Sequence, residues 1–362
     1  MDETISLPSS YKVKPASIQQ MYYPSQKHLK RHSISSLVII SSSDNNTPAG
    51  SRPASLIFSS QPASPNFNAL VLMKDGQLLD DEDIEDHYWL DDANKQSERW
   101  VIKHELVKLA IDGLFSSPES TVTRDEKHVL QVGCGDAAWS IDVAIEHPRW
   151  VVVGIDDGDG GPSPNRRAVP KNFKFIRCYD SLLEGMKSLP EGTFDMVACR
   201  FMIMSFNFEQ YKQLVAECLR VCKVDGYVEI MEMDLRIYNQ RSISNSVTQV
   251  LNSEVIHVIE SKSLDPRLAR RLPDLLDETI TNEMIEAKYI SLPLGVWGGR
   301  LGVMFRDDVH ALIESMQIDV ADLKEHHQVR SDGELDYKLD IMDHELDTNR
   351  AFMNLHLMLI QK

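Results

Sequence analysis

The sequence has no run of about 18 apolar residues, the least that a helix needs to cross a lipid bilayer. Its five cysteines are few, odd in number and scattered, which favours reduced thiols over a disulfide framework. A basic excess is also missing, because the formal net charge at pH 7 is -17. These absences argue against a membrane segment and against direct binding to nucleic acid phosphates. The first ten residues are polar and acidic, unlike a signal peptide, so we expect the cytoplasm or the nucleus as the location.

The amino-terminal part of the chain differs in composition from the rest. Residues 1–66 hold 16 serines and 7 prolines. They carry six Lys/Arg and three acids, a net of +3, which leaves -20 for the remainder. A segment of this composition can bury little apolar surface, too little to offset the conformational entropy that it would lose on ordering. We therefore expect 1–68 to be a disordered tail. We hypothesise that a regulatory protein binds this tail, and that an acidic lead-in over 69–92 joins it to one folded domain over 93–362.

From residue 128 onwards, short apolar runs alternate with amphipathic stretches. The alternation predicts right-handed βαβ crossovers and therefore an α/β fold with a parallel sheet. Later in the chain we expect two further helices and a strand near 287–292, while the final apolar run, 352–360, fits either a strand or a helix. The predicted strands of the first part are 128–132, 150–155, 173–177, 194–199 and 227–233, and its helices are 137–147, 180–189 and 208–222.

The segment most suited to chemistry is 129–139 (VLQVGCGDAAW), where a strand runs into a glycine turn that opens a helix. Glycines permit positive φ and let a ligand approach the backbone, and a helix N-terminus offers free N–H donors. Asp156, 23 residues after Gly133, ends the next strand and can accept hydrogen bonds from both ribose hydroxyls. These features fit S-adenosylmethionine, and they also fit a dinucleotide, because Gly133-x-Gly135-x-x-Ala138 matches the GxGxxG/A fingerprint. A tight turn without any ligand is the third alternative.

Five segments, in the right order, resemble the class I S-adenosylmethionine-dependent methyltransferases, and more closely a fungal branch that includes methyltransferase-like regulators of secondary metabolism. The resemblance implies a Rossmann-like, mostly parallel seven-stranded sheet flanked by helices. It also implies a core over 125–235 and a substrate-side cap formed by 93–115 and 236–310. The segments are 129–139, 154–156 (GID), 172–180 (NFKFIRCYD), 189–200 (LPEGTFDMVACR) and 219–232 (LRVCKVDGYVEIME).

The same resemblance implies a row of cofactor-binding residues. Asp156 would hold the ribose, Asp180 would lie near the adenine, and Arg200 would face the amino-acid end of the cofactor. No catalytic residue can be assigned, and no metal site is expected, because Cys218-x-x-x-Cys222 lacks further ligands. The predicted cofactor-binding set is Gln131, Gly133, Cys134, Gly135, Asp156, Asp157, Asp180 and Arg200.

Two departures from the family pattern bear on function. Gln131 stands where the family has an acid, and Ala137 stands where it has a third glycine. The leading hypothesis is an S-adenosylmethionine-dependent methyltransferase (EC 2.1.1.-) that acts on an unidentified small-molecule or protein acceptor. The departures motivate a first alternative, a catalytically weak methyltransferase-like scaffold or regulator. An NAD(P)-dependent oxidoreductase is the second alternative.

Overall fold

The computed structural model describes residues 14–16, 93–116, 126–158, 161, 168–239, 246–279, 284–316 and 334–362. Most of the predicted tail and all of the acidic lead-in lie outside the described residues. The strands are β1 (Lys14–Ala16), β2 (His128–Val132), β3 (Val151–Asp156), β4 (Phe173–Arg177), β5 (Phe194–Arg200), β6 (Cys222–Met233), β7 (Met284–Pro293) and β8 (Phe352–Gln361). The α-helices are α2 (Ala93–Ile111), α3 (Ala138–Glu146), α4 (Leu182–Ser188), α5 (Phe208–Val221), α6 (Val247–Ser261), α7 (Leu268–Thr279), α8 (Gly299–Ser315) and α9 (Glu334–Thr348), and the 3-10 turns are η4 (Met202–Met204) and η5 (Val296–Gly298).

The strands form one sheet in the order β1-β7-β8-β6-β5-β2-β3-β4. All neighbouring pairs from β6 to β4 are parallel, whereas β8 runs antiparallel to both β6 and β7. The expected Rossmann-like, mostly parallel seven-stranded sheet is therefore confirmed. An eighth strand, β1, pairs in parallel with the outer side of β7, at a place where the sequence indicated only a disordered tail.

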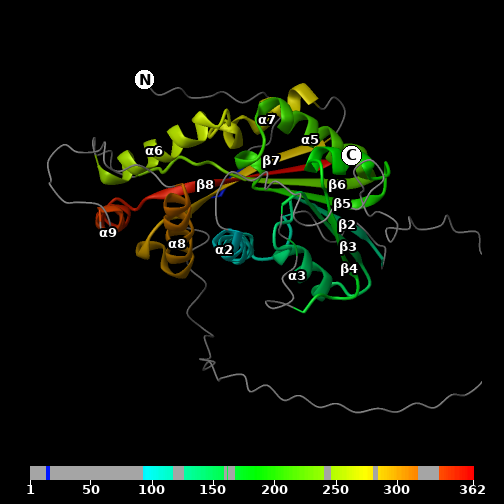
Figure 1. Cartoon of the computed structure of the whole chain (residues 1–362), viewed down its shortest axis with the longest axis horizontal. Coiled ribbons are helices and arrows are strands. Elements are labelled where there is room, and N and C mark those ends of the chain that lie inside the picture. The colour runs from blue at the N-terminus through cyan, green and yellow to red at the C-terminus, as the bar shows by residue number, and fades with distance from the viewer. Residues whose placement is uncertain are drawn as a thin grey trace, which may run out of the picture.

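Helices cover both faces of the sheet, with α2, α3 and α8 on one side and α5, α6 and α7 on the other (Figure 1). The central strands β2, β3, β5 and β6 are buried over almost their whole length. A parallel strand that is covered on both faces needs apolar side chains in both directions, which explains the continuous apolar runs in the sequence. Because parallel strands end at one edge, the carboxyl ends of β2, β3, β5 and β6 gather in one place.

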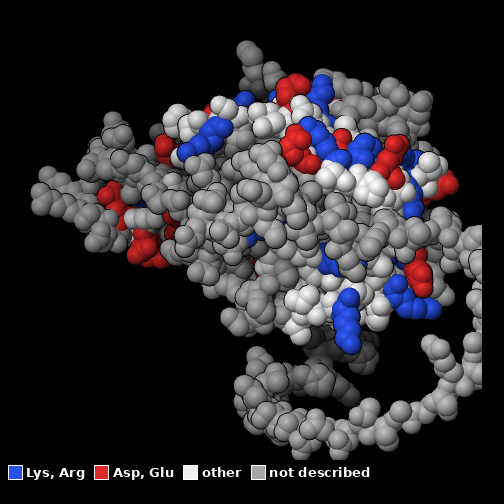
Figure 2. Space-filling model, turned by 45° about the vertical axis from the view of Figure 1, so that its right-hand side comes forward, with Lys and Arg blue, Asp and Glu red and all other residues white. Residues whose placement is uncertain are grey.

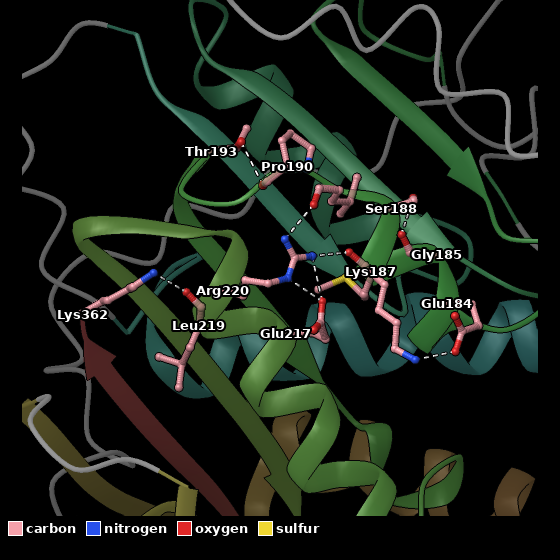
Figure 3. A network of polar contacts seen from close by, with 12 residues as sticks. Glu184, Gly185, Lys187, Ser188, Pro190, Thr193, Glu217, Leu219, Arg220 and Lys362 are labelled. Atoms are coloured by element: carbon pink, nitrogen blue, oxygen red, sulfur yellow. Dashed lines mark hydrogen bonds and ion pairs between the residues drawn. The ribbon is translucent and has the colours of Figure 1, made fainter.

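The final apolar run is a strand, which resolves the ambiguity of the sequence pattern. β8 inserts between β6 and β7, and its register places Glu232 of β6 opposite His356. Lys362, which follows β8, also holds this strand to the end of α5. Its Nζ donates to the carbonyl of Leu219 at 2.8 Å (Figure 3). It also donates to the carbonyl of Cys222 at 2.9 Å. The same end of α5 is held to α4 by Arg220, which donates to two carbonyls there (Figure 3).

Helices α7 and α9 were not expected from the sequence.

Lys, Arg, Asp and Glu side chains intermingle on the described part of the face shown in Figure 2. All five cysteines are buried and free. Among the described residues, no helix combines the length and the apolar content that are needed to span a bilayer.

Candidate functional site

The glycine turn after β2 is folded against the end of β3. Gly133 and Gly135 have φ of +62° and +54°, in the left-handed region that glycine adopts without steric cost. The backbone N–H groups of Gly133 and Cys134 both donate to the carbonyl of Ile155, at 2.9 and 3.2 Å. Ala137, the departure from the third glycine, has φ of +61° and immediately precedes α3. The turn thus keeps the shape of a glycine-rich turn despite the alanine.

Asp156 directs its carboxylate at this turn. Its Oδ2 accepts a hydrogen bond from the Gly135 N–H at 2.7 Å, and its Oδ1 accepts one from the Gly158 N–H at 2.9 Å. The side chain is only 8% exposed, and burial raises the pKa of Asp156 to about 6, against the opposing effect of the two backbone donors. A carboxylate has about four lone-pair sites, so further donors such as ribose hydroxyls can still bind.

Two side chains from other elements cover the glycines. The Trp100 ring of α2 lies where a Cβ on Gly135 would be, and the Met202 thioether of η4 lies where a Cβ on Gly133 would be. Neither side chain separates Asp156 from Gly135, since these two are directly hydrogen-bonded. The sequence analysis did not place Trp100 or Met202 at the turn, because both come from segments distant in the chain.

Three other predicted residues lie around the turn in different roles. The Cys134 thiol packs against Gly154, where an added Cβ would lie 2.8 Å from its sulfur, and burial raises the pKa of Cys134 well above its ordinary value. Asp157 accepts from the Leu182 N–H at 2.8 Å and so holds the start of α4. Asp180 is exposed in the loop before α4.

Gln131 and Arg200 make contacts with the α3 side of the sheet. Gln131 Oε1 accepts from the Ser140 hydroxyl at 2.6 Å. Arg200 donates from NH2 to Glu229 Oε1 at 2.7 Å and lies 4.5 Å from the centre of the Trp139 ring. Arg200 thus forms a buried salt bridge with Glu229, whereas the resemblance implied a role at the amino-acid end of a cofactor.

One group of side chains could in principle bind a metal ion. Ligand atoms of His104, Glu105 and Asp142 lie within 4.8 Å of one another. However, the Asp142 oxygen that His104 Nε2 contacts at 3.0 Å is also 2.9 Å from Lys108 Nζ. The ammonium group occupies the place where a cation would bind, so this group fastens α2 to α3 as an ion-pair network.

The sequence analysis missed Glu232, the last acid of the VEIMEM strand. Its side chain is 0% exposed, and its Oε1 accepts from the Tyr211 hydroxyl at 2.7 Å and from the Met202 N–H at 2.6 Å. Glu232 therefore lies beside η4, the same short turn whose Met202 covers Gly133. The available signal was a second acid, three residues after Glu229, in the buried part of the strand near its carboxyl end.

We expect Gly135→Ala to lower the free energy of unfolding by about 1–3 kcal/mol through the left-handed backbone alone, and by more because of the Trp100 ring. The added Cβ would overlap that ring. Gly192→Ala is the matched control, because Gly192 has φ of +59° with nothing within 4 Å of an added Cβ. Chemical denaturation measures both, and equal losses in the two variants would contradict the packing of Trp100 on the turn.

Comparison with known proteins shows which proteins this sequence is similar to. Residues 129–226 match the family model described as a methyltransferase domain. The chain is 26% identical over 154 residues to the N-methyltransferase verN of Clonostachys rogersoniana, which covers 42% of this chain and 52% of that protein. It is 34% identical over 112 residues to the secondary metabolism regulator laeA of Aspergillus fumigatus, covering 30% and 27% of the two chains. It is 24% identical over 169 residues to the methyltransferase str3 of Strobilurus tenacellus, covering 46% and 57%.

The chain thus spans about half the length, or less, of the curated relatives that it matches. The match to the family model includes the glycine turn and Asp156 and ends within β6, before the 236–310 part of the predicted cap.

Proposed function

We propose that this chain is an S-adenosylmethionine-dependent methyltransferase (EC 2.1.1.-). Its support from comparison is that residues 129–226 match a methyltransferase domain model and that the chain is similar to fungal N-methyltransferases and laeA regulators. It would transfer a methyl group from S-adenosylmethionine to a small-molecule or protein acceptor. The relatives do not point to one acceptor, because they include an N-methyltransferase, a methyltransferase and a secondary metabolism regulator.

The observation that carries the proposal is the contact between Asp156 and the glycine turn. The carboxylate accepts a hydrogen bond from the Gly135 N–H, so an acidic acceptor for ribose hydroxyls and a glycine turn lie together. The residues fit an adenosine, because Gly133 and Gly135 have no Cβ and the carboxylate has spare lone pairs. An adenosine that crosses the turn must shift the Trp100 ring, which packs on Gly135.

The protein's own part in the reaction is to bind and orient. S-adenosylmethionine supplies an activated methyl group on a sulfonium, so the chain contributes chiefly proximity and exclusion of water. Asp156 would orient the nucleoside, and Gly133 and Gly135 would let it approach the backbone. Asp157 and Asp180 stay proposed cofactor residues, at the start of α4 and in the loop before it.

We expect calorimetric titration of the purified full chain to show binding of S-adenosylmethionine and of S-adenosylhomocysteine, and none of NAD. Binding of NAD alone would overturn the proposal in favour of an oxidoreductase. The two sulfur compounds share the nucleoside and differ in charge, so binding of both would locate recognition in the nucleoside site.

A second candidate function is a methyltransferase-like scaffold or regulator that binds cofactor weakly. The observation that favours it is that Gln131 and Arg200, two of the predicted cofactor residues, are engaged with Ser140 and Glu229. In this case neither S-adenosylmethionine nor NAD would bind in the titration. The partner of such a scaffold is proposed to bind the 1–68 tail, which lies almost entirely outside the described residues.

A further inference from the structure

We propose that the Glu232 carboxylate faces the methyl group that is transferred and takes up the proton of an acceptor that is methylated at an N–H or O–H group. This inference rests on the proposed function, because it concerns the same site. It adds a catalytic residue and an acceptor class, an amine, amide or hydroxyl compound in place of a carbon acceptor.

The first support is an unsatisfied oxygen atom. Glu232 Oε1 is fully engaged by the Tyr211 hydroxyl and by the Met202 N–H. Glu232 Oε2 is buried and has no hydrogen-bond partner among the residues that the structure describes. Leaving a buried acceptor without a donor costs free energy, because its hydrogen bonds to water are lost, so native structures rarely keep one without a reason. A ligand that brings an N–H or O–H group would satisfy it.

The second support is position. β2, β5 and β6 are consecutive neighbours in the parallel sheet, so Gly133 after β2 and Glu232 at the end of β6 flank the end of β5. Met202, just beyond β5, joins the two: its N–H donates to Glu232 and its thioether covers Gly133. One short turn therefore separates Glu232 from the proposed cofactor site.

The third support is the electrostatic environment of the carboxyl group. Burial raises the pKa of Glu232 to about 8, while the Tyr211 hydroxyl, the η4 backbone donors and Lys103 of α2 oppose the rise. The other titratable groups nearby are the Cys199 thiol of β5, whose pKa the hydrogen bond with Cys218 and burial raise well above its ordinary value, and His356 of β8. Burial lowers the pKa of His356 to about 4, so it is neutral. A base whose pKa lies near the working pH is the most effective one.

Lys103 does not neutralise this carboxylate by a direct pair. Its Nζ lies 3.5 Å from Asp308 Oδ2 of α8 and 5.0 Å from the centre of the Phe201 ring. Burial lowers the pKa of Lys103, and Asp308 opposes this. The ammonium group is thus held by the cap, and Glu232 keeps one oxygen free for the acceptor.

The proposed step balances without any further reagent. The lone pair of the acceptor nitrogen or oxygen forms the bond to the methyl carbon. The carbon–sulfur bond breaks, and its electron pair stays on the sulfur as a neutral thioether. The proton that the acceptor atom loses passes to Glu232 Oε2, and solvent takes it after the products leave.

The test compares the two sulfur compounds in the full chain, without needing the acceptor. An ionised carboxylate close to the methyl group favours the positively charged sulfonium of S-adenosylmethionine over the neutral thioether of S-adenosylhomocysteine. The quantity measured is the Kd of S-adenosylhomocysteine divided by the Kd of S-adenosylmethionine. We expect this ratio to rise with pH between about pH 6 and pH 10 in the unmodified protein. The rise should be about tenfold or more greater than in Glu232→Gln. The amino groups of the ligands titrate in both proteins, so the difference between the proteins reports Glu232.

Glu191→Gln is the matched control, since it removes the same charge from an exposed glutamate in the turn before β5. It is expected to behave as the unmodified protein. If both compounds bind but the ratio has the same pH dependence with and without Glu232, the inference is wrong and the proposed function stands. If neither compound binds the unmodified protein, the proposed function falls, and this inference falls with it.

Thermal unfolding shows independently whether Glu232→Gln folds. The folded-state pKa of Glu232, about 8, lies above the ordinary value of 4.5. Its contribution to stability is therefore complete below about pH 4.5 and is lost as the pH rises through 8. We expect the Gln variant to have a Tm close to the unmodified protein at pH 5 and a higher Tm at pH 9. A lower Tm at pH 9 would contradict the buried, unpaired carboxyl group.

Discussion

Replacing Glu229 by glutamine is expected to lower the free energy of unfolding by about 3–5 kcal/mol, because the Arg200 guanidinium would stay buried without its counter-charge. Glu229 is 0% exposed and Arg200 is 5% exposed, and their closest atoms are 2.7 Å apart. Burial lowers the pKa of Arg200, and Glu229 opposes this effect. Urea denaturation of the purified chain measures the loss.

The matched control removes both charges. Arg200→Met combined with Glu229→Leu leaves no buried ion, so the double variant is expected to recover most of the loss. A single Glu229→Gln variant within about 1 kcal/mol of the unmodified protein would show that the pair is not buried as described. The pair matters for the site, because Glu229 also holds Ser116, whose N–H and hydroxyl both donate to its Oε2 and so fix the segment after α2.

Asp156→Ala is expected to weaken binding of S-adenosylmethionine about 10- to 150-fold, or about 1.5–3 kcal/mol, the scale of hydrogen bonds to a charged group. Among the described residues, Asp156 is the one whose carboxylate accepts a hydrogen bond from the Gly135 N–H. Isothermal calorimetry measures the change, and an unchanged affinity would remove Asp156 from the site. Asp156→Asn is the matched variant, since it keeps one oxygen acceptor and loses the charge, and it should show a smaller loss.

The pH dependence of the unmodified protein checks the same residue. The pKa of Asp156 without ligand is about 6, and donation by ribose hydroxyls favours the ionised form. Cofactor affinity is therefore expected to fall as the pH drops below 6, with uptake of a proton on release of the ligand. In Asp156→Asn this decline should be absent.

Local patterns were sufficient for much of the fold. The predicted strand 128–132 matches β2, and 173–177 matches β4, residue for residue. Both are short apolar runs bounded by turn residues, and such signals depend only on neighbours in the chain. The final apolar run, 352–360, in contrast, forms a strand because it pairs on both sides, with β6 and with β7, through backbone hydrogen bonds.

Periodicity also failed to predict two helices. α7 carries Pro273 inside it, and a proline ordinarily argues against a helix interior, although Leu268, Leu272, Leu275 and Leu276 recur at helical spacing and are buried. α9 is rich in acids, and its short apolar face is recognisable only from the partners that bury Leu339, Met342 and Leu346. Helices that gain their stability mainly from tertiary packing leave a weak trace in the sequence.

By itself the sequence determined that a glycine turn follows a buried strand and that an acid ends the next strand, because turn chemistry and strand length act over a few residues. It therefore located Gly133, Gly135 and Asp156 correctly relative to one another. Only the tertiary structure decided that Arg200 pairs with Glu229, that Trp100 covers the turn, and that Glu232 keeps a buried oxygen free. Those side chains meet partners that lie tens of residues away in the chain. The pKa of a buried charged group therefore depends on the groups that tertiary packing places next to it.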